Sequence, residues 1–295
     1  MSTTESPAAS NSKGEAIDGA KAARIKVEPY PHHVRIECNG QTIADTRRAW
    51  LLIETWAPDI YVPAEDVQTA LFSPSETRTY CPYKAGHASH VNARIGGKTV
   101  ADVGWRYDEP ADRPEIKGLY AFTFAKVSIF VDGKLVRGHV RDPHKIITVE
   151  PLGRRLRLEM AGKMIVDSNN VQVLYETGLP ARYYVPPADV AVDYLTPSSR
   201  QSVCTYKGEA VYHHVRVGDE LSENAIWAYN EPWLDFSPDV ARIKGHFGIF
   251  TSVFDRFLLD DEEQEVDDST RQSDRGALAR PTVDKELQSK MSGGA

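Results

Sequence analysis

The sequence predicts a mainly β protein made of two tandem homologous small β-rich domains, with only minor helical elements. Three observations carry this prediction. One ordered set of short motifs occurs twice, apolar and polar residues alternate through most of both copies, and helical periodicity is scarce. Each copy exceeds a hundred residues, which indicates two globular domains rather than a solenoid.

The repeat is clearest at two tripeptides. Val-Glu-Pro begins at Val27 and again at Val149, 122 residues later, and Tyr-Val-Pro begins at Tyr61 and at Tyr184. The alignment predicts five segments along the chain. They are a disordered stretch at 1–23, a first domain at 24–133, a linker at 134–145, a second domain at 146–259 and a disordered acidic tail at 260–295.

Strands are expected wherever the alternation has period two. Residues 33–38 alternate in this way, the hairpin signal Asn39-Gly40 follows, and the alternation resumes at 41–44. Further strands are expected at 24–27, 90–95, 99–105, 120–124 and 127–131, with their counterparts in the second copy. Residues 63–72 give the one helical signal, and its counterpart at 187–195 is weaker, so at most one or two turns are expected.

The composition is that of an ordinary globular protein. Hydrophobic residues make up 41% and charged residues 26%, and the formal net charge of −7 argues against nucleic acid as a partner. No apolar stretch is long enough for a membrane span, and the first twenty residues lack the apolar core of a signal peptide. Three cysteines without a CxxC pair favour a reducing compartment and no metal site, so we expect a cytoplasmic protein. No cofactor motif is present, and the cofactor stays unknown.

The strongest chemical signal is Cys-x-Tyr-Lys, at Cys81–Lys84 and again at Cys204–Lys207. An ammonium favours the thiolate form of a nearby sulfur, and the thiolate is the nucleophile. In an extended segment residues three apart point to opposite faces, so a turn at Pro82 or Thr205 is required. The alternative is a buried structural cysteine beside a surface lysine.

Other residues shared by the copies are candidates for ligand binding. A carboxylate amid apolar neighbours needs a partner if it is buried, and an aromatic pair can line a pocket. The candidates are Glu54, Tyr61, His90, Trp105 and Glu109 in the first copy, and Glu176, Tyr184, His213, Trp227 and Glu231 in the second. For the tryptophans and histidines a purely structural role is the alternative.

The ordered motifs Glu-Thr, Tyr-Val-Pro, Cys-x-Tyr-Lys, Trp-x-Tyr-x-Glu-Pro and Ile-Lys-Gly resemble domain-of-unknown-function family 427, here as a tandem pair. The resemblance covers nearly everything outside the ends and the linker, and it implies a small β-rich domain and a nucleotidyltransferase-like label. Copy two keeps Cys-x-Tyr-Lys-Gly, whereas copy one has Ala85 before Gly86.

Three functions follow as hypotheses. The first is a small-molecule site in each repeat around Cys-x-Tyr-Lys, as a thiol-dependent enzyme in its catalytic version. The second is a non-catalytic binding or scaffold module in which the repeats dock on each other or on a partner. The third is nucleotidyl transfer, although the metal-holding carboxylates that this chemistry normally needs are not seen in the spacing.

Overall fold

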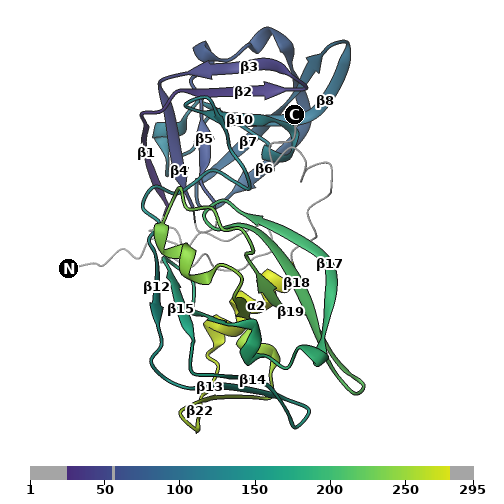
Figure 1. Cartoon of the computed structure of the whole chain (residues 1–295). Coiled ribbons are helices and arrows are strands. Elements are labelled where there is room, and N and C mark those ends of the chain that lie inside the picture. The colour runs from purple at the N-terminus through teal and green to yellow at the C-terminus, as the bar shows by residue number, and fades with distance from the viewer. Residues whose placement is uncertain (1–24, 55–56, 280–295) are drawn as a thin grey trace, which may run out of the picture. The chain divides into compact units, whose positions relative to one another are not determined.

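The computed structural model describes residues 25–54 and 57–279 (Figure 1). The chain divides into two compact units, with the boundary between Asp142 and Pro143. Each unit is a small β-rich domain, and all of their strand ladders are antiparallel. The fold class predicted from the sequence is therefore confirmed.

The first domain contains eleven named strands in its described residues. They are β1 (Lys26–Tyr30), β2 (Val34–Cys38), β3 (Gln41–Thr46), β4 (Ala49–Ile53), β5 (Asp59–Tyr61), β6 (Phe72–Cys81), β7 (Gly86–Ile95), β8 (Lys98–Tyr107), β9 (Tyr120–Phe122), β10 (Ser128–Val131) and β11 (Lys134–Leu135). They form three sheets in the orders β1-β4-β5, β11-β10-β2-β3 and β6-β7-β8-β9. A pair of backbone hydrogen bonds between Val62 and Tyr120, each 2.8 Å, links the first sheet to the third.

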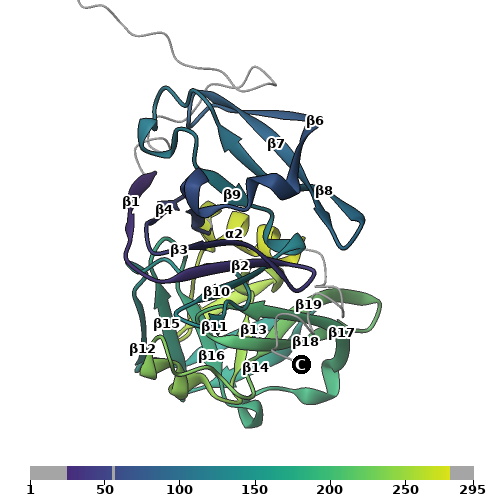
Figure 2. The same ribbon diagram turned by 90° about the horizontal axis from the view of Figure 1, so that it is seen from above.

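The second domain repeats this order. Its elements are β12 (Ile147–Pro151), β13 (Leu156–Met160), β14 (Lys163–Ser168), β15 (Gln172–Glu176), β16 (Arg182–Val185), β17 (Leu195–Cys204), β18 (Gly208–Val217), β19 (Glu220–Ala228), β20 (Phe247–Ile249), β21 (Arg256–Leu259), β22 (Glu262–Glu263) and the helix α2 (Asp268–Leu278). Here β16 and β20 pair over three residues, which merges two sheets into one of order β12-β15-β16-β20-β19-β18-β17. The other sheet runs β14-β13-β21-β22. Figure 2 shows three long strands, β6, β7 and β8, that are neighbours in the third sheet of the first domain.

Local sequence signals account for the turns. Asn39 and Gly40 both have positive φ, 49° and 78°, as a two-residue hairpin requires. The helical signal at 63–72 yields two single 3-10 turns, Ala64–Asp66 and Thr69–Leu71, and the second copy has the same pair at Pro187–Asp189 and Val192–Tyr194. Pro63 and Pro186 precede these turns, and no side chain caps them, so neither extends into a helix.

Each domain buries side chains on both faces of the sheet that begins it. In β4, Leu51 and Leu52 are both fully buried and belong to different apolar clusters, because consecutive residues of a strand face opposite ways. The smaller cluster of the first domain contains Tyr61, Tyr107 and Ile116. Among the predicted site residues of the first copy, Tyr61 belongs to this smaller cluster, and Cys81 and Trp105 pack against it.

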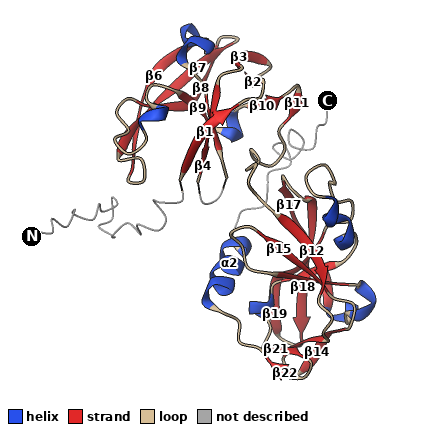
Figure 3. Cartoon of the chain, turned by 90° about the vertical axis from the view of Figure 1, so that its left-hand side faces the viewer, coloured by secondary structure: helices blue, strands red, loops and turns tan. Residues whose placement is uncertain are grey.

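Two of the three segments outside the predicted domains, the linker at 134–145 and the tail at 260–295, differ from expectation. The predicted linker begins with β11, and Val140 is buried in the core of the first domain. The predicted tail contains β22 and then the helix α2 (Figure 3). Asp267 caps this helix by accepting from Thr270 N at 2.7 Å. Composition suggested disorder because the segment is polar, yet the domain holds it through specific ion pairs described below. The expected disorder at 1–23 and 280–295 lies outside the described residues, within which no helix has the length and apolar character to span a bilayer.

Candidate functional site

The Cys-x-Tyr-Lys motif forms the turn of a long hairpin in each domain. Cys81 ends β6 and Gly86 begins β7, and the Lys84 N–H donates to the Cys81 carbonyl at 3.3 Å. Lys207 makes the same 3.3 Å bond to Cys204. This is the turn that the motif requires for its cysteine and lysine to lie on the same side.

In the first domain the turn places Lys84 between a carboxylate and a thiol. Its ammonium forms an ion pair with Glu54, which follows β4, and lies 3.8 Å from the Cys81 sulfur. The Lys84 side chain is buried, whereas the Glu54 side chain is 30% exposed. The sulfur is half-buried. An ammonium at this distance stabilises negative charge on the sulfur.

In the second domain the same ion pair is more deeply buried. Lys207 pairs with Glu176, whose side chain is only 7% exposed, and Lys145 lies 3.5 Å from the second oxygen of that carboxylate. Burial opposes the charge on Lys207, but the adjacent Cys204 and Glu176 outweigh it and raise the pKa of Lys207. Burial likewise opposes the charge on Glu176, and the two lysines lower its pKa below the usual value.

The tyrosine and tryptophan candidates meet beside the ion pair. Trp105 Nε1 donates to the Tyr61 hydroxyl at 3.3 Å, and Trp227 Nε1 donates to the Tyr184 hydroxyl at 3.1 Å. Both tyrosines are fully buried. These bonds satisfy polar atoms inside an apolar cluster, which is also what a structural role requires.

The tyrosine of the Trp-x-Tyr-x-Glu-Pro motif belongs to this cluster, although the sequence analysis did not select it. Burial and the charges of Cys81 and Glu54 raise the pKa of Tyr107, and burial and Cys204 do the same for Tyr229. The sequence does contain a signal for Tyr107. Residues two apart in a strand share a face, so Tyr107 is expected on the same face as the candidate Trp105.

The motif's glutamates point elsewhere. The side chains of Glu109 and Glu231 are 80% and 83% exposed and pair with Lys117 and Lys244 at 2.6 and 2.7 Å. Their backbone, by contrast, lies against the turn, because a Cβ on Gly86 would lie 3.1 Å from the Glu109 carbonyl oxygen. The Glu-Pro segment therefore supports the Cys-x-Tyr-Lys turn through its backbone.

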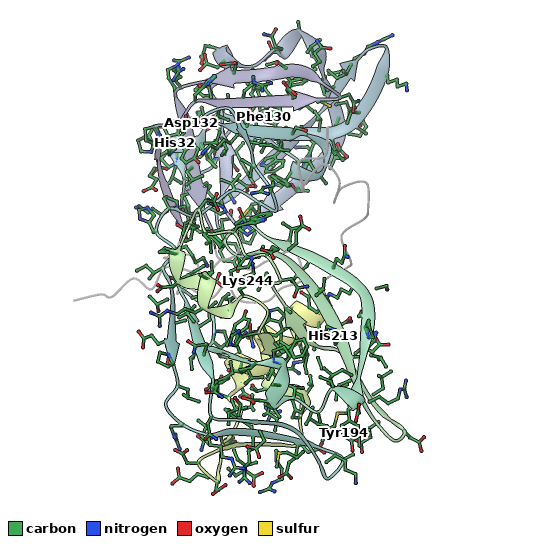
Figure 4. All side chains as sticks on the ribbon, in the orientation of Figure 1. His32, Phe130, Asp132, Tyr194, His213 and Lys244 are labelled. Carbon is green, nitrogen blue, oxygen red and sulfur yellow. The ribbon has the colours of Figure 1, made fainter. Side chains whose placement is uncertain are left out.

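The two candidate histidines do not occupy equivalent positions. His90 lies opposite Trp105 in the β7–β8 ladder, whereas Tyr212 lies opposite Trp227 and His213 is one residue further along β18 (Figure 4). The same shift appears in hydrogen bonds, because Thr79 contacts His90 at 3.2 Å and Ser202 contacts Tyr212 at 2.8 Å. Ala85 is an extra residue that the first turn absorbs, because Cys81 pairs with Gly86 just as Cys204 pairs with Gly208. The residues of β7 therefore match those of β18 that lie 122 positions later, which makes Tyr212 the counterpart of His90. The alignment of the two histidines is corrected accordingly.

Neither histidine contacts the ion pair through any described bond. Each has a buried Nδ1 atom without a described hydrogen-bond partner. Burial, with a smaller contribution from His214, lowers the pKa of His213.

The first domain contains a cavity of about 460 Å³ next to Glu54. Its wall is mostly apolar, with Ile60, Phe122, Phe124 and Ile129 among the contributors, and its polar groups are Glu54, Asp59 and His139. Burial and the nearby Glu54 raise the pKa of Asp59 to about 6, with Lys84 acting in the opposite direction. Asp59 was not among the residues predicted from the sequence, and the second copy has Arg182 at its position.

In the second domain α2 covers the equivalent place. Arg182 forms an ion pair with Asp274 of α2, and Asp274 also accepts from the backbone N–H of Ser252 at 3.2 Å. Ser252 occupies the position of Ala125, another cavity residue of the first domain. Arg200 holds the other end of the helix by donating to the carbonyls of Ala277 and Leu278 at 2.6 and 2.9 Å.

The chain matches one protein family twice. The family model NTP_transf_9, described as Domain of unknown function (DUF427), covers residues 26–133 and 148–260. The chain therefore belongs to this family and carries two of its domains in tandem. No curated protein matches the sequence significantly.

The nucleotidyltransferase label comes only from the name of that family model. Within residues 25–54 and 57–279 no group of three or more histidine, cysteine or carboxylate side chains is placed to share a metal ion.

Proposed function

We propose that the first domain binds a small molecule in the cavity beside Glu54, and that the second domain retains the same polar cluster in a closed form. One observation carries this proposal. Glu54 belongs both to the cavity wall and to the ion pair with Lys84, so the conserved cluster of the repeat reaches a hollow of ligand size.

The cavity has the character of a ligand pocket. Apolar side chains supply most of its wall, and a few charged groups on one part of that wall can orient a ligand. Binding is a better-supported function than thiol catalysis, because Cys81 lies beyond Glu54 and Lys84 rather than among the described residues of the wall.

The binding proposal can be tested with indole as a neutral probe on the full chain. Ile129 lines the cavity, and its counterpart in the second domain is Phe257. Ile129 pairs with Ile36 of β2, and Phe257 pairs with Leu158, the equivalent residue of β13. The variant Ile129→Phe therefore places a larger side chain where this fold already accepts one. We expect indole binding, followed by ligand-observed NMR, to weaken at least tenfold.

Phe130→Leu is the matched control. Phe130 lies on the same strand and is not among the described residues of the cavity wall, and leucine is the residue at the equivalent position, 258, of the second domain. It should leave indole binding unchanged. Failure of indole to bind the unmodified chain, or equal binding by Ile129→Phe, contradicts a small-molecule site at this position.

A thiol-dependent reaction is the second candidate, and the 3.8 Å contact between Lys84 Nζ and Cys81 Sγ favours it. We expect iodoacetamide to alkylate Cys81 faster than the buried Cys38, and Lys84→Met to slow that reaction about tenfold at pH 7. Peptide mass spectrometry separates the three sites. Lys117→Met, which removes an exposed lysine paired with Glu109, is the control. An alkylation rate that Lys84→Met does not change removes the case for a lysine-activated thiol.

A further inference from the structure

We infer that the ligand of the first domain's cavity is a protonated amine with an apolar body of about the size of one aromatic ring. This inference rests on the proposed small-molecule site and specifies its ligand class. The charges in the cavity wall, the shape of its apolar part and the reversed arrangement in the second domain all support it.

The cavity carries uncompensated negative charge. Glu54 and Asp59 contribute two carboxylates, and none of the described residues of the wall is a lysine or an arginine. The charge of Glu54 is matched by Lys84. No described residue makes a hydrogen bond or ion pair with the Asp59 carboxylate, and Lys84, the one cation that lowers its pKa, is already paired with Glu54. A cationic ligand can therefore supply a direct ion-pair partner for Asp59.

The unfavourable environment of Asp59 agrees with this reading. Burial and the proximity of Glu54 raise the pKa of Asp59 to about 6, even though Lys84 opposes the shift. A cation bound beside Asp59 would compensate both effects, because it supplies charge of the missing sign in a poorly solvated place. An anion would increase the repulsion.

The apolar part of the wall determines the rest of the ligand. Phe122 and Phe124 contribute aromatic rings, and Ile60 contributes an aliphatic side chain. Aromatic faces attract cations, and aliphatic and aromatic groups favour an apolar body over a polar one. A cavity of about 460 Å³ accommodates a ring with a short aminoalkyl chain.

The second domain shows the same place with its charges reversed. Arg182 stands at the position of Asp59, and the group bound to it is a carboxylate, that of Asp274 from the chain's own helix. In the second domain, the charged side chain at this strand position therefore pairs with an oppositely charged side chain from a segment outside the β-sheets. With a carboxylate at the position instead, the complementary group is a cation.

The experiment compares three probes that share one ring, namely benzylamine, benzyl alcohol and benzoate. Binding to the full chain is measured by ligand-observed NMR at pH 8. We expect benzylamine to bind at least tenfold more tightly than the other two, and Asp59→Asn to remove this preference. Asp193→Asn, the same change at an exposed residue of the second domain, should preserve it.

A charge swap provides the decisive variant. Asp59→Arg introduces the second domain's residue and should reverse the preference, so that benzoate binds more tightly than benzylamine. Equal or tighter binding of benzyl alcohol or benzoate by the unmodified chain overturns the amine inference but leaves the cavity site standing. Benzylamine binding that Asp59→Asn does not weaken also overturns it. If none of these probes and no indole binds, the small-molecule site itself is refuted.

Discussion

The two domains retain the same ion pair and differ in what surrounds it. In the first, Glu54 is partly exposed at a cavity, and Asp59 stands nearby with no ion-pair partner among the described residues. In the second, Glu176 is buried under two lysines, and Arg182 is neutralised by a helix from the same chain. The two copies therefore share the polar cluster, and in the second copy its surroundings are closed. This difference is the basis for proposing that the first copy binds a ligand and that the second depends on the cluster for stability.

The largest expected effect comes from breaking the buried pair of the second domain. Lys207→Met leaves the Glu176 carboxylate buried beside only Lys145, and removing one partner of a buried ion pair typically costs about 3–5 kcal/mol. The equivalent Lys84→Met should cost less, because water reaches the Glu54 side chain. Urea unfolding of both variants measures the difference.

Lys244→Met removes a lysine from an exposed ion pair with Glu231 and serves as the control, with an expected cost of about 0–1 kcal/mol. If Lys84→Met destabilises the chain as much as Lys207→Met does, the two clusters are buried to the same effective degree and the proposed contrast between them is wrong.

The second expected effect concerns the helix that closes the second domain. Asp274 is fully buried and pairs with Arg182, whose side chain is 11% exposed, so Asp274→Ala should destabilise the protein by about 3 kcal/mol, the lower end of the range for a broken buried ion pair. It should also increase hydrogen exchange in α2, because the helix loses its central attachment. Gln272→Ala, at an exposed position of the same helix, is the matched control. Unchanged protection of α2 in Asp274→Ala would mean that the ion pair does not hold the helix in place.

Sequence patterns predicted the parts of this molecule that depend on local periodicity. The Asn39-Gly40 hairpin and the period-two strands follow from residues adjacent in the sequence, and the duplicated motifs located the Cys81–Lys84 turn. Asp59 was missed because its significance arises from a cavity formed by distant segments, and because the second copy has arginine there.

The helix α2 was missed for a related reason. Its sequence is polar, and the hydrophobic pattern gives no sign that Asp274 lies in a buried ion pair with a residue 92 positions earlier. Composition measures the average character of a segment, whereas two charged side chains decide whether this one is ordered. The histidine misalignment has another cause. Ala85 is visible as an extra residue before Gly86, but the nearby histidines His90 and His213 offer a false match that places the insertion elsewhere.

A third, smaller effect should appear when the charge of Asp59 is removed. The pKa of Asp59 is raised to about 6, above the unfolded value near 4, so the native state becomes less stable as the pH rises from 4 through 6. Asp59→Asn should therefore stabilise the protein at pH 8 by about 1–3 kcal/mol and have little effect at pH 4. Urea unfolding at both pH values tests this. Destabilisation at pH 8 would mean that the carboxylate has a favourable partner in the folded protein.

The smallest effect should distinguish the two domains at their surface. His32 and His33 pair with Asp132 and Asp45 at 2.7 and 2.8 Å, with His32 beside Asp132 in Figure 4. In the second domain the equivalent partners are arginines, because Arg154 pairs with Asp260 and Arg155 with Asp167. An imidazole loses its charge as the pH rises past neutrality, whereas a guanidinium does not.

Removing the aspartates should reveal this difference. The neighbouring His32 lowers the pKa of Asp132, so that carboxylate is ionised at pH 5.5 and at pH 8. Asp132→Asn should consequently lower the melting temperature more at pH 5.5 than at pH 8. Asp260→Asn should lower it equally at both pH values, because Arg154 remains charged. A pH dependence shared by both variants would show that the histidines do not carry it, and the surface ion pairs of the two domains would then be equivalent.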